Sequence, residues 1–229
     1  MNLVEFEKSA GLSFKNKLLL QQAFTHRSYI NENRSLRLSH NERLEFLGDA
    51  VLELVITKYL FDNFPAKNEG EMTSYRSALV NANTLSEVAE EIGMNDYLLL
   101  SRGEAKDTGR ARQYILANTY EALIGAIYID RGYEAAETFI GGTLYGRVDK
   151  VAKDGGWMDA KSKFQEKAQE ISGFTPMYKT VREEGPDHDK MFTVAVFVGN
   201  EEVAEGNGRS KQDAEQAAAA AALHKKKWL

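Results

Sequence analysis

The spacing of apolar residues changes part way along this chain, and the change limits the folds that it can adopt. Up to about residue 150, apolar residues recur three and four positions apart, as in Phe46-Leu47, Val51-Leu52 and Leu54-Val55-Ile56 and again over 111–130. This is the period of one buried helix face. No alternating strand pattern appears before about residue 174. The first two thirds of the chain are therefore predicted to be all-α.

A second unit follows a charged stretch that ends in Gly155-Gly156. We predict a helical domain over 1–150, a linker over 151–157 and a second domain over 158–229. In the second domain we expect a helix at 159–172, strands at 177–182, 191–198 and 201–206, and a closing helix capped by Ser210. Gly199-Asn200 predicts the turn of a hairpin, and the run Ala217–Ala222 is slim enough to lie close against a sheet. The order α-β-β-β-α predicts a small α+β domain.

Composition excludes several classes of site. The 229 residues include no Cys, which removes disulfides, thiolate metal sites and cysteine nucleophiles and fits a reducing compartment. The first eight residues carry acids where a secretory signal needs basic and then apolar residues, and no apolar run approaches the roughly 18 residues of a membrane span. We therefore expect a cytoplasmic protein without a membrane partner. Because the net charge is −5, a nucleic-acid site must be a local patch.

An acidic helix face lies in the segment 41–52. Glu42, Glu45 and Asp49 fall in one narrow sector of a helix, and Glu53 extends it. Such like charges destabilise a helix by a few tenths of a kcal/mol per pair, so a counter-ion is expected. Oxygen-only ligands suit a hard divalent cation, which for phosphate chemistry is usually Mg²⁺. The alternative is a solvated acidic face, although the apolar neighbours of these acids favour a partly desolvated cleft.

Asn118 and Glu121 form a second pair of polar residues, three positions apart in an otherwise apolar helical segment. This spacing makes them neighbours on one helix face. Taken alone, the pair is also typical of a buried, hydrogen-bonded Asn beside an ion-paired Glu.

These segments together resemble the bacterial ribonuclease III family. The nonapeptide Asn41-Glu42-Arg43-Leu44-Glu45-Phe46-Leu47-Gly48-Asp49 is similar to the family signature. Further segments in family order and spacing are Thr25-His26-Arg27-Ser28-Tyr29, Glu69-Gly70-Glu71-Met72 and 118–130. In the tail, Gly185-Pro186-Asp187-His188 and Gly206-Asn207-Gly208-Arg209-Ser210-Lys211 resemble a double-stranded-RNA-binding domain. The resemblance covers nearly the whole chain.

The resemblance implies an all-α endonuclease domain followed by an RNA-binding domain, and a Mg²⁺-dependent endoribonuclease for which Mn²⁺ could substitute. It implies a homodimer with one acidic centre per subunit that cuts both strands of double-stranded RNA. The expected products carry 5′-phosphate and 3′-hydroxyl ends with a short 3′ overhang. Processing of structured precursors such as rRNA and mRNA is the expected role.

By the same resemblance, the catalytic residues are Glu42, Glu45, Asp49, Asn118 and Glu121. Glu45 and Glu121 would be direct metal ligands, and Asp49 and Asn118 would complete the site. Most of the family has Asp where this chain has Asn118, and because an amide carries no charge, weaker metal binding is expected. Phe46 would belong to the dimer contact, whereas its sequence pattern alone favours ordinary core.

Duplex RNA presents a wide, shallow minor groove and phosphates across the major groove. We expect phosphate contact at the start of the closing helix, where Ser210 and Lys211 lie and the helix dipole favours an anion. The family often has a second Lys where this chain has Gln212. In the first helix of this domain, Lys161, Gln165 and Glu166 are expected to contact one minor groove. The loop that contains Pro186 and His188 is expected to enter the next minor groove.

Two rival functions stay open at this stage. One is a duplex-RNA-binding protein on a nuclease scaffold that has lost catalysis, motivated by Asn118. The other is an all-α phosphohydrolase for small molecules, against which the α-β-β-β-α tail argues.

Overall fold

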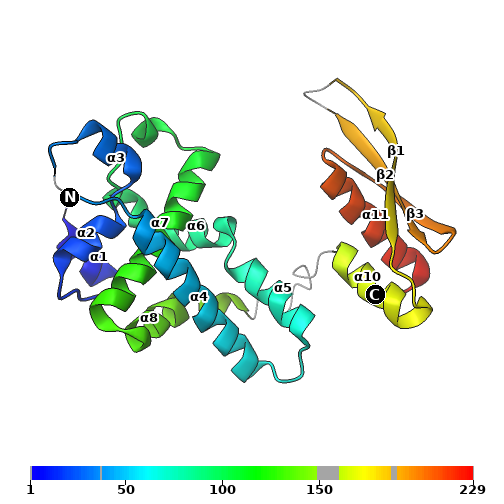
Figure 1. The fold of residues 1–229 in the computed structure, drawn as a ribbon, viewed down its shortest axis with the longest axis horizontal. Helices are drawn as coiled ribbons and strands as arrows, with labels where there is room; N and C mark the ends of the chain where they lie inside the picture. The colour runs from blue at the N-terminus through cyan, green and yellow to red at the C-terminus, as the bar shows by residue number, and fades with distance from the viewer. Residues whose placement is uncertain (1, 37, 149–159, 187–189, 229) are drawn as a thin grey trace. The chain divides into compact units, whose positions relative to one another are not determined.

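The computed structural model describes residues 2–36, 38–148, 160–186 and 190–228. Its contacts divide the chain into two compact units, Met1–Trp157 and Met158–Leu229. The predicted linker over 151–157 lies outside the described residues. The predicted fold class, a helical domain followed by an α-β-β-β-α domain, is confirmed (Figure 1).

The described part of the first unit is helical. Its α-helices are α1 (Leu3–Ser9), α2 (Lys17–Ala23), α3 (Arg27–Glu32), α4 (Glu42–Asn63), α5 (Glu69–Leu79), α6 (Ala82–Glu91), α7 (Arg110–Arg131) and α8 (Tyr133–Ile140). Short 3-10 turns, η1 (Met94–Tyr97) and η2 (Glu104–Lys106), join α6 to α7, and a π-helical turn, η3 (Gly141–Tyr145), follows α8. The two 22-residue helices α4 and α7 are the longest of these elements.

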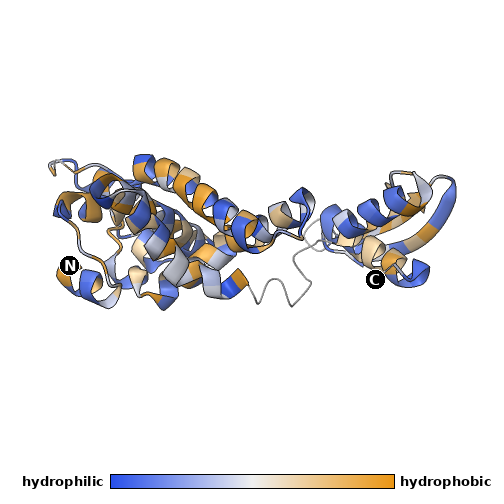
Figure 2. Ribbon diagram, turned by 90° about the horizontal axis from the view of Figure 1, so that it is seen from below, coloured by the Kyte–Doolittle hydropathy of each residue, from blue (hydrophilic) through white to orange (hydrophobic). Residues whose placement is uncertain are grey.

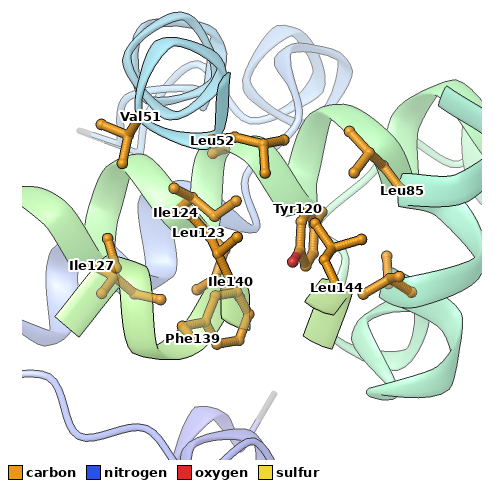
Figure 3. Close-up of a cluster of buried hydrophobic side chains, with 14 of the residues drawn as sticks. Val51, Leu52, Leu85, Tyr120, Leu123, Ile124, Ile127, Phe139, Ile140 and Leu144 are labelled. Carbon is orange, nitrogen blue, oxygen red and sulfur yellow. The ribbon is translucent and has the colours of Figure 1, made fainter. Parts of the chain in front are cut away.

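The core of this unit lies between α4, α7 and the helices around them. Val51 and Leu52 of α4 point towards Leu123 and Ile124 of α7, as Figure 3 shows, and Ile140 of α8 closes the cluster from the other side. On α4 the buried positions recur at three- and four-residue spacing, as the sequence predicted. Burial of such side chains stabilises the unit by roughly 1.5–3 kcal/mol each.

Helix caps were predicted less well than helix faces. Thr84-Leu85-Ser86-Glu87 has capping-box form, which predicts Thr84 as the N-cap of a helix. The structure instead starts α6 at Ala82 with Asn81 as its N-cap, and the Asn81 side chain accepts the backbone N–H of Thr84 at 2.9 Å. The described capping box is at α5. There Asn68 accepts from the Glu71 N–H, and the Glu71 carboxylate accepts from the Asn68 N–H.

The second unit packs two helices on a three-stranded antiparallel sheet. Its elements are α10 (Ala160–Ser172), β1 (Met177–Glu184), β2 (Met191–Val198), β3 (Glu201–Gly208) and α11 (Lys211–Lys226), with strand order β1-β2-β3. The predicted hairpin turn is confirmed, with Gly199 at φ +59°. A side chain at Gly206 would place its Cβ 2.0 Å from the backbone nitrogen of Ala218, so α11 lies directly against β3. The small residues of α11 allow this approach, as predicted.

Apolar and hydrophilic residues alternate around the helices of both units (Figure 2). Among the described helices, none combines the length and the apolar character that crossing a membrane requires. The cytoplasmic location expected from the sequence stays a prediction.

Candidate functional site

Two glycines set the distance between α4 and α7. A Cβ at Gly48 would lie 1.7 Å from the carbonyl oxygen of Glu121, and a Cβ at Gly125 would lie 2.2 Å from the carbonyl oxygen of Leu44. Both distances are far below van der Waals contact, so the two backbones touch where these glycines face each other. The crossing brings the acidic first half of α4 against the segment of α7 that carries Glu121.

Three carboxylates meet at this crossing: Glu45 and Asp49 from α4, and Glu121 from α7. Burial raises the pKa of Glu121 to about 8, and the charges of Asp49 and Glu45 add to the shift. The pKa of Glu45 is also raised, by burial and then by the charges of Glu42 and Asp49. Burial, followed by the charge of Glu53, raises the pKa of Asp49. Glu45 and Glu121 are half-buried and Asp49 is exposed, so the acids of α4 and α7 lie in a partly desolvated region.

These three carboxylates lack neutralising partners within the described residues. None of them forms an ion pair or accepts a side-chain hydrogen bond there. Glu42 differs, because its carboxylate lies 3.4 Å from the Arg27 guanidinium and 3.7 Å from the His40 ring. Glu42 is therefore at the edge of the cluster, where it acts on Glu45 through its charge.

Asn118 lies one turn before Glu121 on α7 and is half-buried. Its side chain makes no hydrogen bond to any residue that the structure describes. Together with the three carboxylates it offers oxygen donors alone, the set that a hard divalent cation prefers. The uncompensated negative charge fits such a cation too.

The carboxylates do not form a closed metal cage as they stand. Over the described ranges, no three His, Cys, Asp or Glu side chains are close enough together to hold a metal ion. The side chains would have to move closer together to hold a cation. Glu45 and Asp49 have room to do so, because Glu45 is only half-buried and Asp49 is exposed.

Phe46 is 82% exposed, so its interpretation as core is wrong. It begins an apolar stripe along α4 that continues through Leu54 and Phe61, which are also exposed. A groove of about 590 Å³ lies beside it, and its lining includes Leu19, Leu47 and Ile129 together with Phe46 itself. Nothing within the described chain covers this ring, which leaves it available to another molecule.

The second unit gathers part of the predicted RNA-binding set. Lys161, in the first turn of α10, lies beside the first turns of α11, because its backbone N–H donates to the Gln216 side chain at 3.2 Å. Ser210 caps α11 by accepting the Asp213 N–H, as predicted, and Lys211 follows it. Gln165 and Glu166 are exposed on α10. Pro186 is exposed at the end of a described segment, and His188 lies outside the described residues.

Sequence reasoning missed two groups of residues. Gly48 was recognised only as part of the signature, and Gly125 only as part of an apolar segment. The spacing of these glycines could have pointed to a close contact between the helices, because each lies three or four residues from a candidate acid on its own helix. It also missed Glu183 and Glu215, which form ion pairs with Lys211 and Lys161.

Known proteins match both units. Residues 16–148 match the model of a ribonuclease-III-like family, and residues 160–226 match the double-stranded RNA binding motif. The chain is 44% identical to ribonuclease 3 of Anoxybacillus flavithermus over 228 residues, covering 98% of this chain and 94% of the relative. It is 43% identical to ribonuclease 3 of Bdellovibrio bacteriovorus, covering 96% and 94%.

The first unit also matches a solved structure. The nuclease domain of ribonuclease III from Campylobacter jejuni, described for flexibility in a region involved in dimer formation, is 38% identical with a TM-score of 0.55. The match covers 61% of this chain and 96% of that domain.

Proposed function

The chain belongs to the ribonuclease III family, and from that premise we propose that it is a divalent-cation-dependent endoribonuclease that cuts both strands of double-stranded RNA. The observation that carries the proposal is the meeting of Glu45, Asp49 and Glu121 at the crossing of α4 and α7 without a neutralising partner among the described residues. A cation-dependent endoribonuclease needs a centre of this kind, and the double-stranded RNA binding motif that the second unit matches supports duplex binding by the same chain.

Glu45 and Glu121 are the proposed direct ligands of Mg²⁺ or Mn²⁺, and Asp49 and Asn118 complete the site. When bound, such a cation supplies Lewis acidity towards the phosphate and towards water. The protein itself holds the donor oxygens in place through the rigid contact of Gly48 with α7. Glu42, held by Arg27, adds negative charge at the rim. Attack of water on the phosphorus with departure of the 3′-oxygen, which takes up a proton, would leave 5′-phosphate and 3′-hydroxyl ends. A short 3′ overhang would follow when the two strands are cut at offset positions.

The RNA-binding unit holds the substrate by shape. Lys161, Gln165 and Glu166 face one minor groove, and the Pro186–His188 segment faces the next. Ser210 and Lys211 meet the phosphates of the intervening major groove, where the start of α11 favours an anion. This arrangement needs few positively charged side chains, which agrees with the negative net charge of the chain.

Cutting of both strands calls for two acidic centres, so we propose a homodimer. The exposed Phe46 ring and the groove beside it are the proposed contact. Structured precursors such as rRNA and mRNA are the proposed substrates, because they contain the duplex regions that this architecture binds.

The proposal is tested by incubating the full chain with a long duplex RNA, with a single strand of the same sequence, and with each in EDTA. We expect only the duplex to be cut, and only when Mg²⁺ or Mn²⁺ is present. Ligation of the products should require the 5′-phosphate that cleavage leaves on them. A Glu121→Gln chain should bind the duplex as the parent does and leave it uncut. Duplex that is bound at low salt and stays uncut with either cation would show that the proposed activity is wrong.

A further inference from the structure

Both lysines proposed to contact RNA are already occupied within their own domain. The Lys161 Nζ on α10 donates to the Glu215 carboxylate on α11 at 2.6 Å. The Lys211 Nζ lies 3.1 Å from the Glu183 carboxylate on β1. A phosphate that approaches either lysine therefore meets a carboxylate at the same ammonium group.

The pairing of Glu215 is selective. Glu215 lies four residues after Lys211 on α11, a spacing at which the two side chains are neighbours on the helix surface. Its carboxylate nevertheless pairs with Lys161 across the interhelical contact, where the Glu215 side chain is 27% exposed. Lys211 turns to β1 instead, and its Nζ also lies 5.6 Å from the centre of the Phe192 ring.

Glu183 faces two lysines. In addition to Lys211, the Lys190 Nζ lies 3.8 Å from the other oxygen of the Glu183 carboxylate. One carboxylate therefore offsets charge from both Lys190, which precedes β2, and Lys211 of α11, at the place where a phosphate is expected.

We propose that Glu183 and Glu215 weaken duplex-RNA binding by holding Lys211 and Lys161, so that RNA has to displace a carboxylate at each lysine. This inference rests on the proposed function, because it assumes that these lysines meet phosphates. Part of the attraction between lysine and phosphate is spent on breaking the intradomain pairs. The carboxylates then remain close to the RNA backbone, where they repel it.

The salt dependence of duplex-RNA binding measures how many lysine charges are available to phosphates. Each lysine that neutralises a phosphate releases condensed cations and adds roughly 0.7–0.9 to the slope of log K against log[salt]. A lysine that exchanges a carboxylate for a phosphate leaves a bare carboxylate, which recruits a cation again. The parent should therefore show a shallower slope than its number of RNA-contacting lysines implies.

The test compares full-length Glu183→Gln and Glu215→Gln with the parent in duplex-RNA binding over a range of salt, without divalent cations. We expect each variant to bind about two- to fivefold more tightly at low salt, the range of a surface ion pair. We also expect a slope steeper by up to about one. Glu201→Gln is the matched control, because it removes the same charge from an ion pair with Lys226 at 2.8 Å, at the opposite end of α11.

A double-mutant cycle separates release of the lysine from loss of a negative charge. Glu215→Gln should tighten binding in the parent background and have no more effect than Glu201→Gln when Lys161 is already Gln. If the parent binds duplex RNA and both variants match Glu201→Gln in affinity and slope, this inference is wrong while the proposed function stands. A parent that binds no duplex RNA overturns the proposed function and this inference together.

Discussion

Gly48 of α4 lies against the carbonyl oxygen of Glu121 on α7, with no space for a side chain between them. The reciprocal contact, Gly125 against the Leu44 carbonyl, lies one turn earlier on α4 and one turn later on α7. Glu121 therefore reaches the acids of α4 because its own backbone is in contact with that helix. The position of the candidate metal ligands depends on two residues that carry no chemistry themselves.

Replacing Gly48 by Ala should separate the two helices. The added methyl group would overlap backbone atoms, which cannot move aside as a side-chain end can, so we expect a loss of at least about 2 kcal/mol of folding free energy. Cleavage should fall further than the remaining folded fraction explains. Denaturant unfolding and a cleavage assay on the same sample measure the two effects.

Gly142→Ala is the matched control for that substitution. Gly142 lies in the π-helical turn after α8, and a Cβ there meets nothing within 4 Å. Its replacement should leave stability and cleavage close to those of the parent. Equal loss in both variants would show that the closeness of α4 and α7 is not the reason for the effect.

Glu121 should make stability depend on pH in the absence of divalent cations. Its pKa rises from 4.5 to about 8 on folding, so the ionised carboxylate opposes folding. The cost is absent below about pH 4.5, grows as the pH rises and is complete above about pH 8. Glu121→Gln should therefore stabilise the chain by about 2 kcal/mol at pH 8.5, a value discounted for partial exposure, and by nothing at pH 4.

Thermal melting in EDTA across this pH range checks the expectation. Glu90→Gln, an exposed charge removal on α6, is the control and should show no such trend. A Glu121→Gln gain that is the same at pH 4 and pH 8.5 would contradict a raised pKa of this carboxyl as the source of the pH dependence.

Features of this chain that depend on a few adjacent residues could be predicted from its sequence, whereas features that depend on packing between distant segments could not. The Ser210 cap and the Gly199 hairpin turn were predicted correctly because each depends on a few adjacent residues. The start of α6 was not, because Thr84 and Glu87 fit the capping-box pattern as well as Asn81 fits a simple cap. Short polar patterns of this kind occur at more positions in a sequence than the positions at which they cap a helix.

The candidate site shows the same division. Helical spacing placed Glu45 and Asp49 on one face of α4, but it carries no information about which part of α7 that face meets. Nor does it show that Phe46, which lies in an apolar pattern, points to solvent. Both depend on how separate helices pack, and only the family resemblance pointed to them in advance.

Asn118→Asp should strengthen cation binding. The substitution restores a negative charge one turn from Glu121, so we expect half-maximal cleavage at a Mg²⁺ concentration about three- to tenfold lower. In EDTA the added charge should lower the melting temperature, because it increases repulsion within the cluster. Cleavage titrated with Mg²⁺ and melting in EDTA test the two opposite effects, and Asn118→Ser, which removes the amide without adding charge, is the control.

The same variant distinguishes the binding-only alternative. If the parent is inert at every Mg²⁺ concentration and Asn118→Asp cuts duplex RNA, the parent is a binding protein. A parent that cuts, with a higher Mg²⁺ requirement than the variant, supports the enzyme.

Glu7 should stabilise the first unit above its pKa. The side chain is buried, and it accepts the Phe14 N–H at 2.7 Å and the Lys17 ammonium at 2.6 Å. Burial raises its pKa, but these hydrogen bonds outweigh burial, so the net pKa lies below 4.5. The stabilisation is therefore present above about pH 4.5 and is lost as the pH falls through the lowered pKa.

Glu7→Ala should lower the free energy of unfolding by about 1–3 kcal/mol at pH 7, because the Phe14 N–H loses its acceptor. The cost stays moderate since Lys17 is largely exposed and can return to water. Glu5→Ala, on the exposed side of α1, should change stability by less than about 0.5 kcal/mol. Urea unfolding at pH 7 compares the two, and equal values would contradict the structural role of Glu7.

Phe46→Asp should dissociate the proposed homodimer. Burying this exposed ring contributes roughly 1.5–3 kcal/mol, and a two-fold interface contains the contact twice. We therefore expect dissociation to become at least about a hundredfold easier. Sedimentation equilibrium gives the association constant, and cleavage of both strands should fall with the dimer fraction. Val4→Asp, at an exposed apolar residue of α1, should leave the parent's association unchanged. If Phe46→Asp associates as tightly as the parent, this ring is not the contact between subunits.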